Sequence, residues 1–322
     1  MKEFEVGKGW ENRRIDRWLL SSFPRLGRGG TQRCFREKRV RLNGKHVPPD
    51  TPLRQGDLVR LFVDDQLLEP MDKRNRFLED FHPNLRILYE DAHLLIADKQ
   101  PGLLCHPDDR EKNNTLIHHV QAYLYQKRAF QPSDPQAFAP ALLNRLDRFT
   151  GGIVLCARSR VCADILLEKI RTREVEKRYL CITKRAPGAE TGVLRSWISP
   201  AADGRRVVVS DRPQNGAKEA ITDYRVLSRS GELCLLECLL RTGRTHQIRA
   251  QLAHIGHPIL GDPQYGDRAF NARFRRSYQA LYAYRVVFSF ETDAGPLEYL
   301  KGRSFQVRDV PFLREWFPGT TI

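Results

Sequence analysis

Short apolar segments of strand length recur between residues 85 and 290, and segments with helical spacing interrupt them at irregular intervals. The strand-like segments include "HLLIADK", "GIVLCAR", "EKRYLCITK" and "LYAYRVVFSF", whereas "TLIHHVQAYLYQ" and "VCADILLEKIRT" have the apolar period of an amphipathic helix. Strands outnumber helices, and the two do not alternate regularly. The pattern therefore favours an α+β fold with a mixed, largely antiparallel sheet over a doubly wound parallel one.

The first 63 residues differ in character and predict a small α/β domain of their own. "RIDRWLL" has apolar residues at helical spacing, and a second, basic helix is expected after the glycine-rich "LGRGG". Asn43-Gly44 is a strong turn signal between "VRL" and "KHV", so we expect a β-hairpin there and a closing strand at "GDLVRLFV". Residues 64–80 are polar and lack clear periodicity, so we expect a linker that leads to a larger domain at 81–322.

The chain is strongly basic, with 54 Lys and Arg residues against 39 Asp and Glu and a formal net charge of +15. Residues 1–63 hold 15 basic and 7 acidic residues, a net of +8. This charge favours nucleic acid as a partner, although a basic surface without a specific role stays open. The candidate RNA-binding residues of this segment are Arg28, Arg33, Arg36, Lys38, Arg39 and Arg41.

Several classes of protein do not fit the sequence. It has no apolar run of 18 residues, so we expect no membrane span, and its N-terminal segment lacks the apolar core of a secretory signal. Its seven cysteines are odd in number and form no CxxC pair, which favours reduced, buried thiols in a cytoplasmic protein. It also lacks a phosphate-cradling loop, a dinucleotide fingerprint and zinc-ligand spacing, so we expect no cofactor and no metal.

One aspartate stands out in the stretch "NRLDRFTGG". Asp147 lies between Arg145 and Arg148, just before a glycine turn and an apolar strand. The arginines would favour its ionised form, and an ionised carboxylate can act as a nucleophile or a general base. The alternative is a turn aspartate that caps its own backbone, and the local sequence alone favours this second interpretation.

A second cluster of polar residues occurs in "RTGRTHQIRAQLAHIG". Arg241, Arg244, His246 and Arg249 gather where a strand leads into a helix, and donors at such a place can bind an anion or pair with a carboxylate. Apolar residues interleave with the arginines, which indicates half-buried cations. A solvated basic helix face is the alternative.

Four stretches resemble the RluA-type family of RNA pseudouridine synthases, in the order of that family. They are "KQPGLLCHP", "NRLDRFTGG", "EKRYLCITK" and "RTGRTHQIRAQLAHIGHPILGDPQYG". The N-terminal segment resembles the alpha-L RNA-binding domain that often accompanies this family. The resemblance implies a pseudouridine synthase fold at 81–322 and an isomerase that needs no cofactor. It favours large-subunit ribosomal RNA over tRNA as substrate and a monomeric protein.

The resemblance also implies roles for individual residues. Asp147 matches the family's catalytic aspartate, Tyr179 the tyrosine that stacks on the target uracil, and Arg249 the arginine that pairs with the aspartate. Arg145 matches an arginine that fills the space of the flipped base. Arg145, Arg148, Arg244 and His246 are accordingly expected to bind RNA in this domain.

The sequence departs from the family at two places, with Asn144 where histidine is usual and Gly151 where serine is usual. Both departures leave the substrate more open than the activity. Two other functions stay open. One is a ribosome-assembly factor that binds RNA without chemistry, and the other is a nucleoside hydrolase with an aspartate nucleophile.

Overall fold

The computed structural model describes residues 2–68, 77–78, 80–134, 136–320 and 322. The chain divides into two compact units, which we describe separately. The first comprises residues 1–84, 117–141 and 158–161, and the second comprises residues 85–116, 142–157 and 162–322. No helix in the described part of the chain is both long and apolar enough to cross a membrane.

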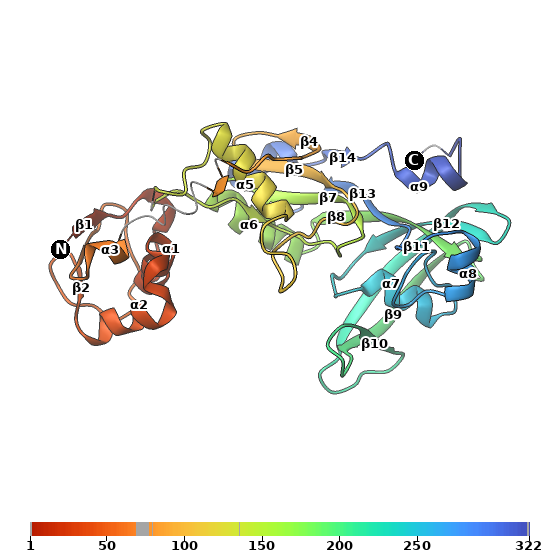
Figure 1. Ribbon diagram of the computed structural model, residues 1–322, viewed down its shortest axis with the longest axis horizontal. Helices are drawn as coiled ribbons and strands as arrows, with labels where there is room; N and C mark the ends of the chain where they lie inside the picture. The colour runs from red at the N-terminus through yellow and green to blue at the C-terminus, as the bar shows by residue number, and fades with distance from the viewer. Residues whose placement is uncertain (1, 69–76, 79, 135, 321) are drawn as a thin grey trace. The chain divides into compact units, whose positions relative to one another are not determined.

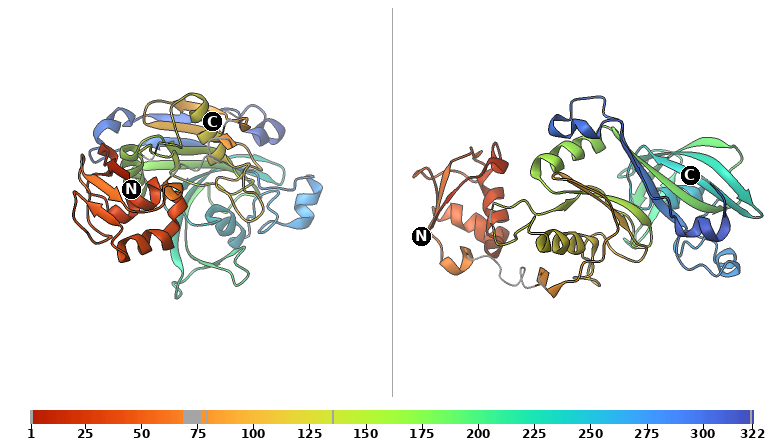
Figure 2. Two further views of the ribbon diagram at one scale, coloured as in Figure 1. Left: turned by 60° about the vertical axis from the view of Figure 1, so that its left-hand side comes forward. Right: turned by 90° about the horizontal axis from the view of Figure 1, so that it is seen from above.

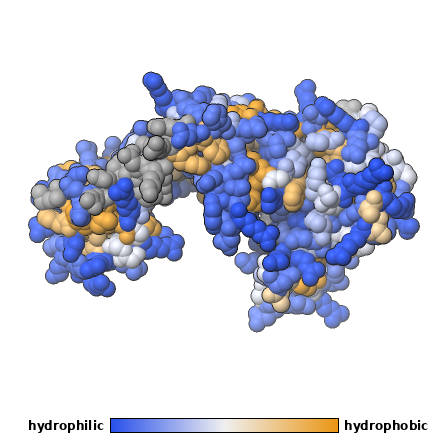
Figure 3. Space-filling view, viewed as in Figure 1, coloured by the Kyte–Doolittle hydropathy of each residue, from blue (hydrophilic) through white to orange (hydrophobic). Residues whose placement is uncertain are grey.

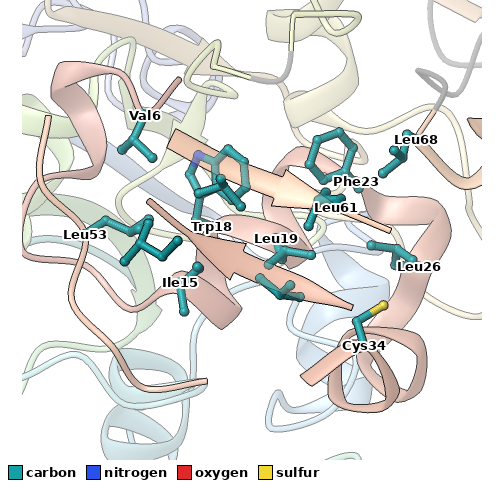
Figure 4. Close-up of a cluster of buried hydrophobic side chains, with 13 residues drawn as sticks. Val6, Ile15, Trp18, Leu19, Phe23, Leu26, Cys34, Leu53, Leu61 and Leu68 are labelled. Carbon is teal, nitrogen blue, oxygen red and sulfur yellow. The ribbon is translucent and has the colours of Figure 1, made fainter. Parts of the chain in front are cut away.

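The first unit contains a small antiparallel sheet in the order β1-β3-β2 and several helices (Figure 1). Its elements are β1 (Lys2–Glu5), η1 (Lys8–Trp10), α1 (Ile15–Ser22), η2 (Pro24–Leu26), α2 (Gly27–Arg36), β2 (Val40–Leu42), β3 (Leu58–Leu61), α3 (Asp65–Leu68) and most of α5 (Leu116–Gln126). The apolar face of α1 is buried against the sheet, and Trp18 and Leu19 are fully buried in this core (Figure 4). This burial confirms the helix predicted for "RIDRWLL".

The hairpin predicted around Asn43-Gly44 is only partly correct. Both residues have the positive φ of a two-residue turn, but the segment after it makes only an isolated bridge, between Leu42 and Lys45. The strand partner of β2 is β3 instead. "KHV" cannot continue as a strand because two prolines follow it and lack the N–H group that a ladder needs.

The expected linker, residues 64–80, is described only in part. Asp65–Leu68 form α3, whereas residues 69–76 and 79 lie outside the described residues. The division into domains at 63 and 81 stays a prediction.

The second unit is built on one large sheet in the order β10-β9-β11-β12-β8-β13-β7-β5-β4, with β14 beside β13 and β6 beside β7. Its neighbouring strands along this order are antiparallel, except that β13 and β7 run parallel. The sheet is strongly twisted along its length (Figures 1 and 2). The predicted α+β class with a mixed, largely antiparallel sheet is confirmed.

The elements of the second unit match most of the predicted segments. They are β4 (Ile87–Glu90), β5 (Leu94–Lys99), β6 (Ala141–Leu142), β7 (Gly151–Ala157), α6 (Arg160–Arg171), β8 (Val175–Lys184), β9 (Thr191–Pro200), β10 (Val207–Ser210), β11 (Lys218–Ser230), β12 (Leu233–Leu240), α7 (Gln247–His254), α8 (Arg268–Arg273), β13 (Leu281–Phe288), η3 (Gly295–Leu300), β14 (Ser304–Gln306) and α9 (Pro311–Trp316). The strands β5 and β7 are buried along their whole length. The continuous apolar sequence of β7 indicates this burial, whereas β5 also buries Asp98 and Lys99 at its end.

Candidate active site

Asp147 lies in the segment between β6 and β7, and the backbone of β7 anchors this segment. The side chain of Asn144 donates a hydrogen bond to the carbonyl of Ile153 (3.2 Å) and accepts one from the N–H of Leu155 (2.8 Å). The N–H of Thr150 donates to the carbonyl of Asp147 (3.1 Å) and closes the turn. Asn144, the first departure from the family pattern, therefore fixes the chain segment before Asp147 to the backbone of β7.

A buried lysine holds the same segment from the other side. Lys99 ends β5 and is 1% exposed, and its ammonium donates to the carbonyls of Leu103 (2.7 Å), Arg148 (3.0 Å) and Gln100 (3.2 Å). Burial lowers the pKa of Lys99 to about 8. This ammonium thus joins two loops at the site and fixes the backbone next to Asp147.

Arg249 connects Asp147 to a second, fully buried carboxylate. Its Nη1 donates to Asp147 Oδ2 (2.8 Å), its Nε and Nη2 donate to Asp262 (2.6 and 3.0 Å), and Nη2 also donates to Gln264 Oε1 (2.8 Å). Burial lowers the pKa of Arg249, but the hydrogen bond and charge of Asp262, and then the charge of Asp147, raise it above its ordinary value. Arg249 is therefore a fixed cation beside Asp147.

The two carboxylates around Arg249 differ in accessibility. The Asp262 side chain is 0% exposed, and it accepts two further hydrogen bonds from the N–H groups of Gln264 (2.9 Å) and Tyr265 (3.0 Å). The Asp147 side chain is 23% exposed. Asp262 is thus the structural partner of the guanidinium, whereas Asp147 keeps an accessible face that a ligand can reach.

His246 borders Asp147 on another side. It precedes α7 with a left-handed backbone (φ 54°), and its Nε2 lies 3.8 Å from Asp147 Oδ1. Its Nδ1 forms a hydrogen bond of 2.9 Å with the hydroxyl of Tyr265, which itself accepts from the N–H of Val207 (2.8 Å). Burial lowers the pKa of His246, so the ring is neutral near pH 7.

Tyr179 lies on β8 and faces the same cavity as Asp147. This cavity has a volume of about 540 Å³ and is lined by Asp147, Tyr179, Arg249 and His246, among others. Tyr179 is 6% exposed, and burial raises the pKa of its hydroxyl above the ordinary value. No described residue forms a hydrogen bond with that hydroxyl, which leaves it available to a ligand. The volume lies in the range of roughly 300–1,000 Å³ that is usual for ligand sites.

The structure distributes the predicted RNA-binding residues over three places. Arg145, Arg244 and His246 line the cavity, whereas Arg148 is exposed outside it and donates to the carbonyl of Gly102 (3.1 Å). Of the six candidates of the N-terminal unit, five lie on or just after α2 and Arg41 lies on β2. Glu37 pairs with two of them, Arg33 and Arg39. These six are Arg28, Arg33, Arg36, Lys38, Arg39 and Arg41.

The face of the molecule in Figure 3 carries mainly hydrophilic residues, in keeping with the charged composition. No group of three His, Cys, Asp or Glu side chains that could hold a metal ion occurs within the described ranges.

Sequence reasoning missed Asp262 and Lys177 in this site. Asp262 lies in the stretch "HPILGDPQYG", where the sequence before Pro263 indicates only a turn. Its pairing with Arg249 depends on the tertiary fold. Lys177 lines the cavity two residues before Tyr179 on β8. The period of a strand could have revealed it, because residues i and i+2 face the same side.

The second departure from the family pattern, Gly151, is explained by the side chain that packs against it. A Cβ atom at this position would lie 2.4 Å from a ring carbon of Tyr282, a fully buried residue of β13. The Tyr282 hydroxyl donates to Asp98 on β5 (2.5 Å), which holds the ring in place. Serine would therefore not fit at 151 beside this tyrosine.

Comparisons with known proteins agree with this geometry. The sequence profile of a family described as "RNA pseudouridylate synthase" matches residues 93–254. The chain is 32% identical over 310 residues to an uncharacterized RNA pseudouridine synthase of Chlorobaculum parvum, with 92% of each chain covered. It is 34% identical over 265 residues to the ribosomal large subunit pseudouridine synthase D of Xylella fastidiosa, which covers 82% of this chain and 75% of that protein.

A solved structure, human RNA pseudouridylate synthase domain containing 1, has a similar fold. Its TM-score is 0.56 at 21% sequence identity, and the match covers 75% of this chain and 93% of that one.

Proposed function

The chain belongs to the RNA pseudouridylate synthase family, an isomerase family that acts on RNA, and we propose that Asp147 is its catalytic nucleophile. The observation that carries this proposal is the asymmetry around Arg249. The guanidinium is anchored on the buried Asp262 and presents its remaining nitrogen to Asp147, whose carboxylate borders the cavity. An ionised, oriented and accessible carboxylate is what nucleophilic catalysis requires.

The proposed chemistry is an isomerisation with no external reactant. Asp147 attacks the uracil ring or the ribose C1′, and the bond between N1 and C1′ breaks. The uracil then rotates and rejoins the ribose through C5. The bond between Asp147 and the atom that it attacked breaks, which returns the free carboxylate, while C5 loses its proton and N1 gains one. Tyr179 lies against the base, and Arg249 orients the carboxylate of Asp147 for the attack through its hydrogen bond.

We further propose that the substrate is large-subunit ribosomal RNA. Relatives from Xylella fastidiosa and Vibrio cholerae are named ribosomal large subunit pseudouridine synthases D and C. The target uridine must leave its stack to reach the cavity, which takes a few kcal/mol that cationic and aromatic contacts offset. The basic N-terminal unit is proposed to contribute to RNA binding as an alpha-L domain. Free thiols at all seven cysteines support a cytoplasmic location.

The test compares Asp147→Asn with Asp309→Asn, the same substitution in an exposed ion pair outside the cavity. The assay measures tritium release from an unmodified large-subunit rRNA transcript that contains 5-tritiated uridine. We expect Asp147→Asn to lower the rate by at least about a thousandfold because the nucleophile is lost, and RNA binding to survive. Asp309→Asn should retain the wild-type rate.

Three results would contradict the proposal in different ways. Full activity of Asp147→Asn would exclude this residue as the nucleophile. Release of free uracil would indicate a hydrolase. RNA binding by the wild-type protein without pseudouridine in any RNA would indicate an assembly factor.

A further inference from the structure

Lys177 is a cation of the cavity that the proposed chemistry does not use. It lies two residues before Tyr179 on β8, so both side chains leave the strand on the same face, roughly 7 Å apart along it. Val175, two residues before Lys177 on the same strand, lines the cavity as well. This face of β8 therefore continues the cavity from the proposed base-stacking residue toward the end of α6.

No described residue forms a hydrogen bond or an ion pair with the Lys177 side chain, although it is partly buried. Its register partners on the neighbouring strands are the apolar residues Leu240 and Val286. Burial lowers the pKa of Lys177, and no acidic side chain opposes this effect. A partly buried ammonium without a partner is unfavourable unless a ligand supplies the missing charge.

Three other cations of the cavity have partners, unlike Lys177. Arg171 pairs with Glu168, Arg241 pairs with Asp223, and Arg244 donates to the carbonyl of Glu219. The side chains of Arg145 and Arg173 form no hydrogen bond or ion pair with a described residue. Arg173 stands in a left-handed conformation (φ 68°) at the turn before β8, close in the chain to Lys177. Two uncompensated cations, Lys177 and Arg173, thus lie at the same end of the cavity.

We propose that Lys177 binds a phosphate group of the RNA strand next to the nucleotide held at Tyr179. This inference rests on the proposed function, because RNA is then the anionic ligand that enters the cavity. Lysine suits the task as a compact charge on a flexible stem, which can follow a phosphate without the fixed fork of an arginine. Lys177 is thus a substrate-positioning residue with no part in bond making.

The test measures the salt dependence of RNA binding in three variants of the full-length protein. The probe is a fluorescein-labelled oligouridylate of about 12 nucleotides, titrated between about 50 and 200 mM KCl. Lys177→Met should bind roughly tenfold more weakly at the low-salt end, as expected for the loss of one charged hydrogen bond. It should lower the slope of log K against log salt by about 0.7, the value for one phosphate contact on a single strand.

Two matched variants serve as controls. Lys177→Arg keeps the charge and should restore the slope, whereas Lys301→Met removes an exposed lysine outside the cavity and should change neither affinity nor slope. Thermal unfolding separates a structural role from a binding role. Since Lys177 has no described partner, the melting temperature of Lys177→Met should equal or exceed that of the wild type.

Two outcomes would overturn the inference. One is an unchanged slope in Lys177→Met, and the other is wild-type binding that does not depend on salt. A fall in the melting temperature of this variant, restored by Lys177→Arg, would assign the lysine a structural role and count equally against it. Failure of the proposed function would be distinguished by a different measurement. The wild-type protein would then form no pseudouridine, whereas the difference in salt slope between the wild type and Lys177→Met would still test whether Lys177 binds a phosphate.

Discussion

The ion pair between Arg249 and Asp262 is expected to be the most energetically sensitive contact of the site. Arg249 is 4% exposed and Asp262 is 0% exposed at the side chain, so water cannot replace either partner. Asp262→Asn removes the negative charge but keeps the shape of the side chain. Removal of one partner of a buried pair destabilises a protein by about 3–5 kcal/mol. In Asp262→Asn the buried guanidinium keeps only the partly exposed Asp147 as its counter-ion.

The corresponding shift in melting temperature follows from the size of the second unit. For a domain of about 150–250 residues, 1 kcal/mol corresponds to roughly 2–4 °C, so Asp262→Asn should lower the melting temperature by about 6–20 °C. Asp309→Asn is the matched control, because the Arg314 and Asp309 side chains are 77% and 53% exposed. An exposed pair contributes about 1 kcal/mol at most, which corresponds to less than about 4 °C.

Differential scanning calorimetry of the full-length protein measures both shifts. Tritium release at a temperature where each variant is folded then shows whether Arg249 still holds Asp147. We expect the rate of Asp262→Asn to fall as well, because asparagine has a single acceptor oxygen and the guanidinium loses one of its two hydrogen bonds to this residue together with the negative charge. A melting temperature no lower than that of Asp309→Asn would refute the role of Asp262 as the buried anchor.

Three further predictions concern neighbouring residues. The pKa of Lys99 is about 8 instead of the usual 10.5, so the unfolded chain binds an extra proton between these values and stability rises with pH. Between about pH 7.5 and 10.5, the free energy of unfolding in urea should rise by about 3 kcal/mol more for the wild type than for Lys99→Met. Parallel plots of the two free energies against pH would contradict this prediction. Tyr179→Phe should leave the melting temperature unchanged. If the hydroxyl of Tyr179 transfers a proton in the reaction, this variant should release tritium about a hundredfold or more slowly than the wild type, and an unchanged rate would exclude that role. Gly151→Ser should lower the free energy of unfolding by about 1–3 kcal/mol through overpacking against Tyr282. This loss should be smaller when Gly151→Ser is combined with Tyr282→Leu, and additive effects of the two substitutions would contradict the steric explanation.

Part of the sheet could be predicted because some of its strands, such as β5 and β7, are buried on both faces. The apolar runs of these strands differ clearly from the amphipathic segments of α5 and α6. The start of α7 was less predictable. The sequence indicates that a strand leads into a helix in "RTGRTHQIRAQLAHIG" but not where the helix begins, and the left-handed backbone of His246 places its start at Gln247. Position 246 itself holds neither glycine nor asparagine, the residues that usually signal this conformation.

The candidate site was predictable only where local sequence or family resemblance pointed to it. Asp147 and Arg249 are 102 residues apart, and their expected pairing came from the resemblance. Nothing local indicates that Asp262 anchors Arg249, because this depends on how two turns meet in three dimensions. The resemblance also could not explain Gly151, whose cause is the ring of Tyr282 on a distant strand.

The parallel contact between β7 and β13 has a consequence for folding kinetics. These strands are joined in register at only two pairs, Gly151 with Tyr282 and Ala283 with Gly152, whereas the strands on either side form longer antiparallel ladders. A short parallel contact between segments about 130 residues apart in the chain closes a long loop and forms slowly. Asp147 belongs to one side of this join and Tyr179 to the other. The two halves of the sheet can therefore gain most of their structure before Asp147 meets Tyr179. Recovery of activity during refolding would then report the formation of the contact between β7 and β13.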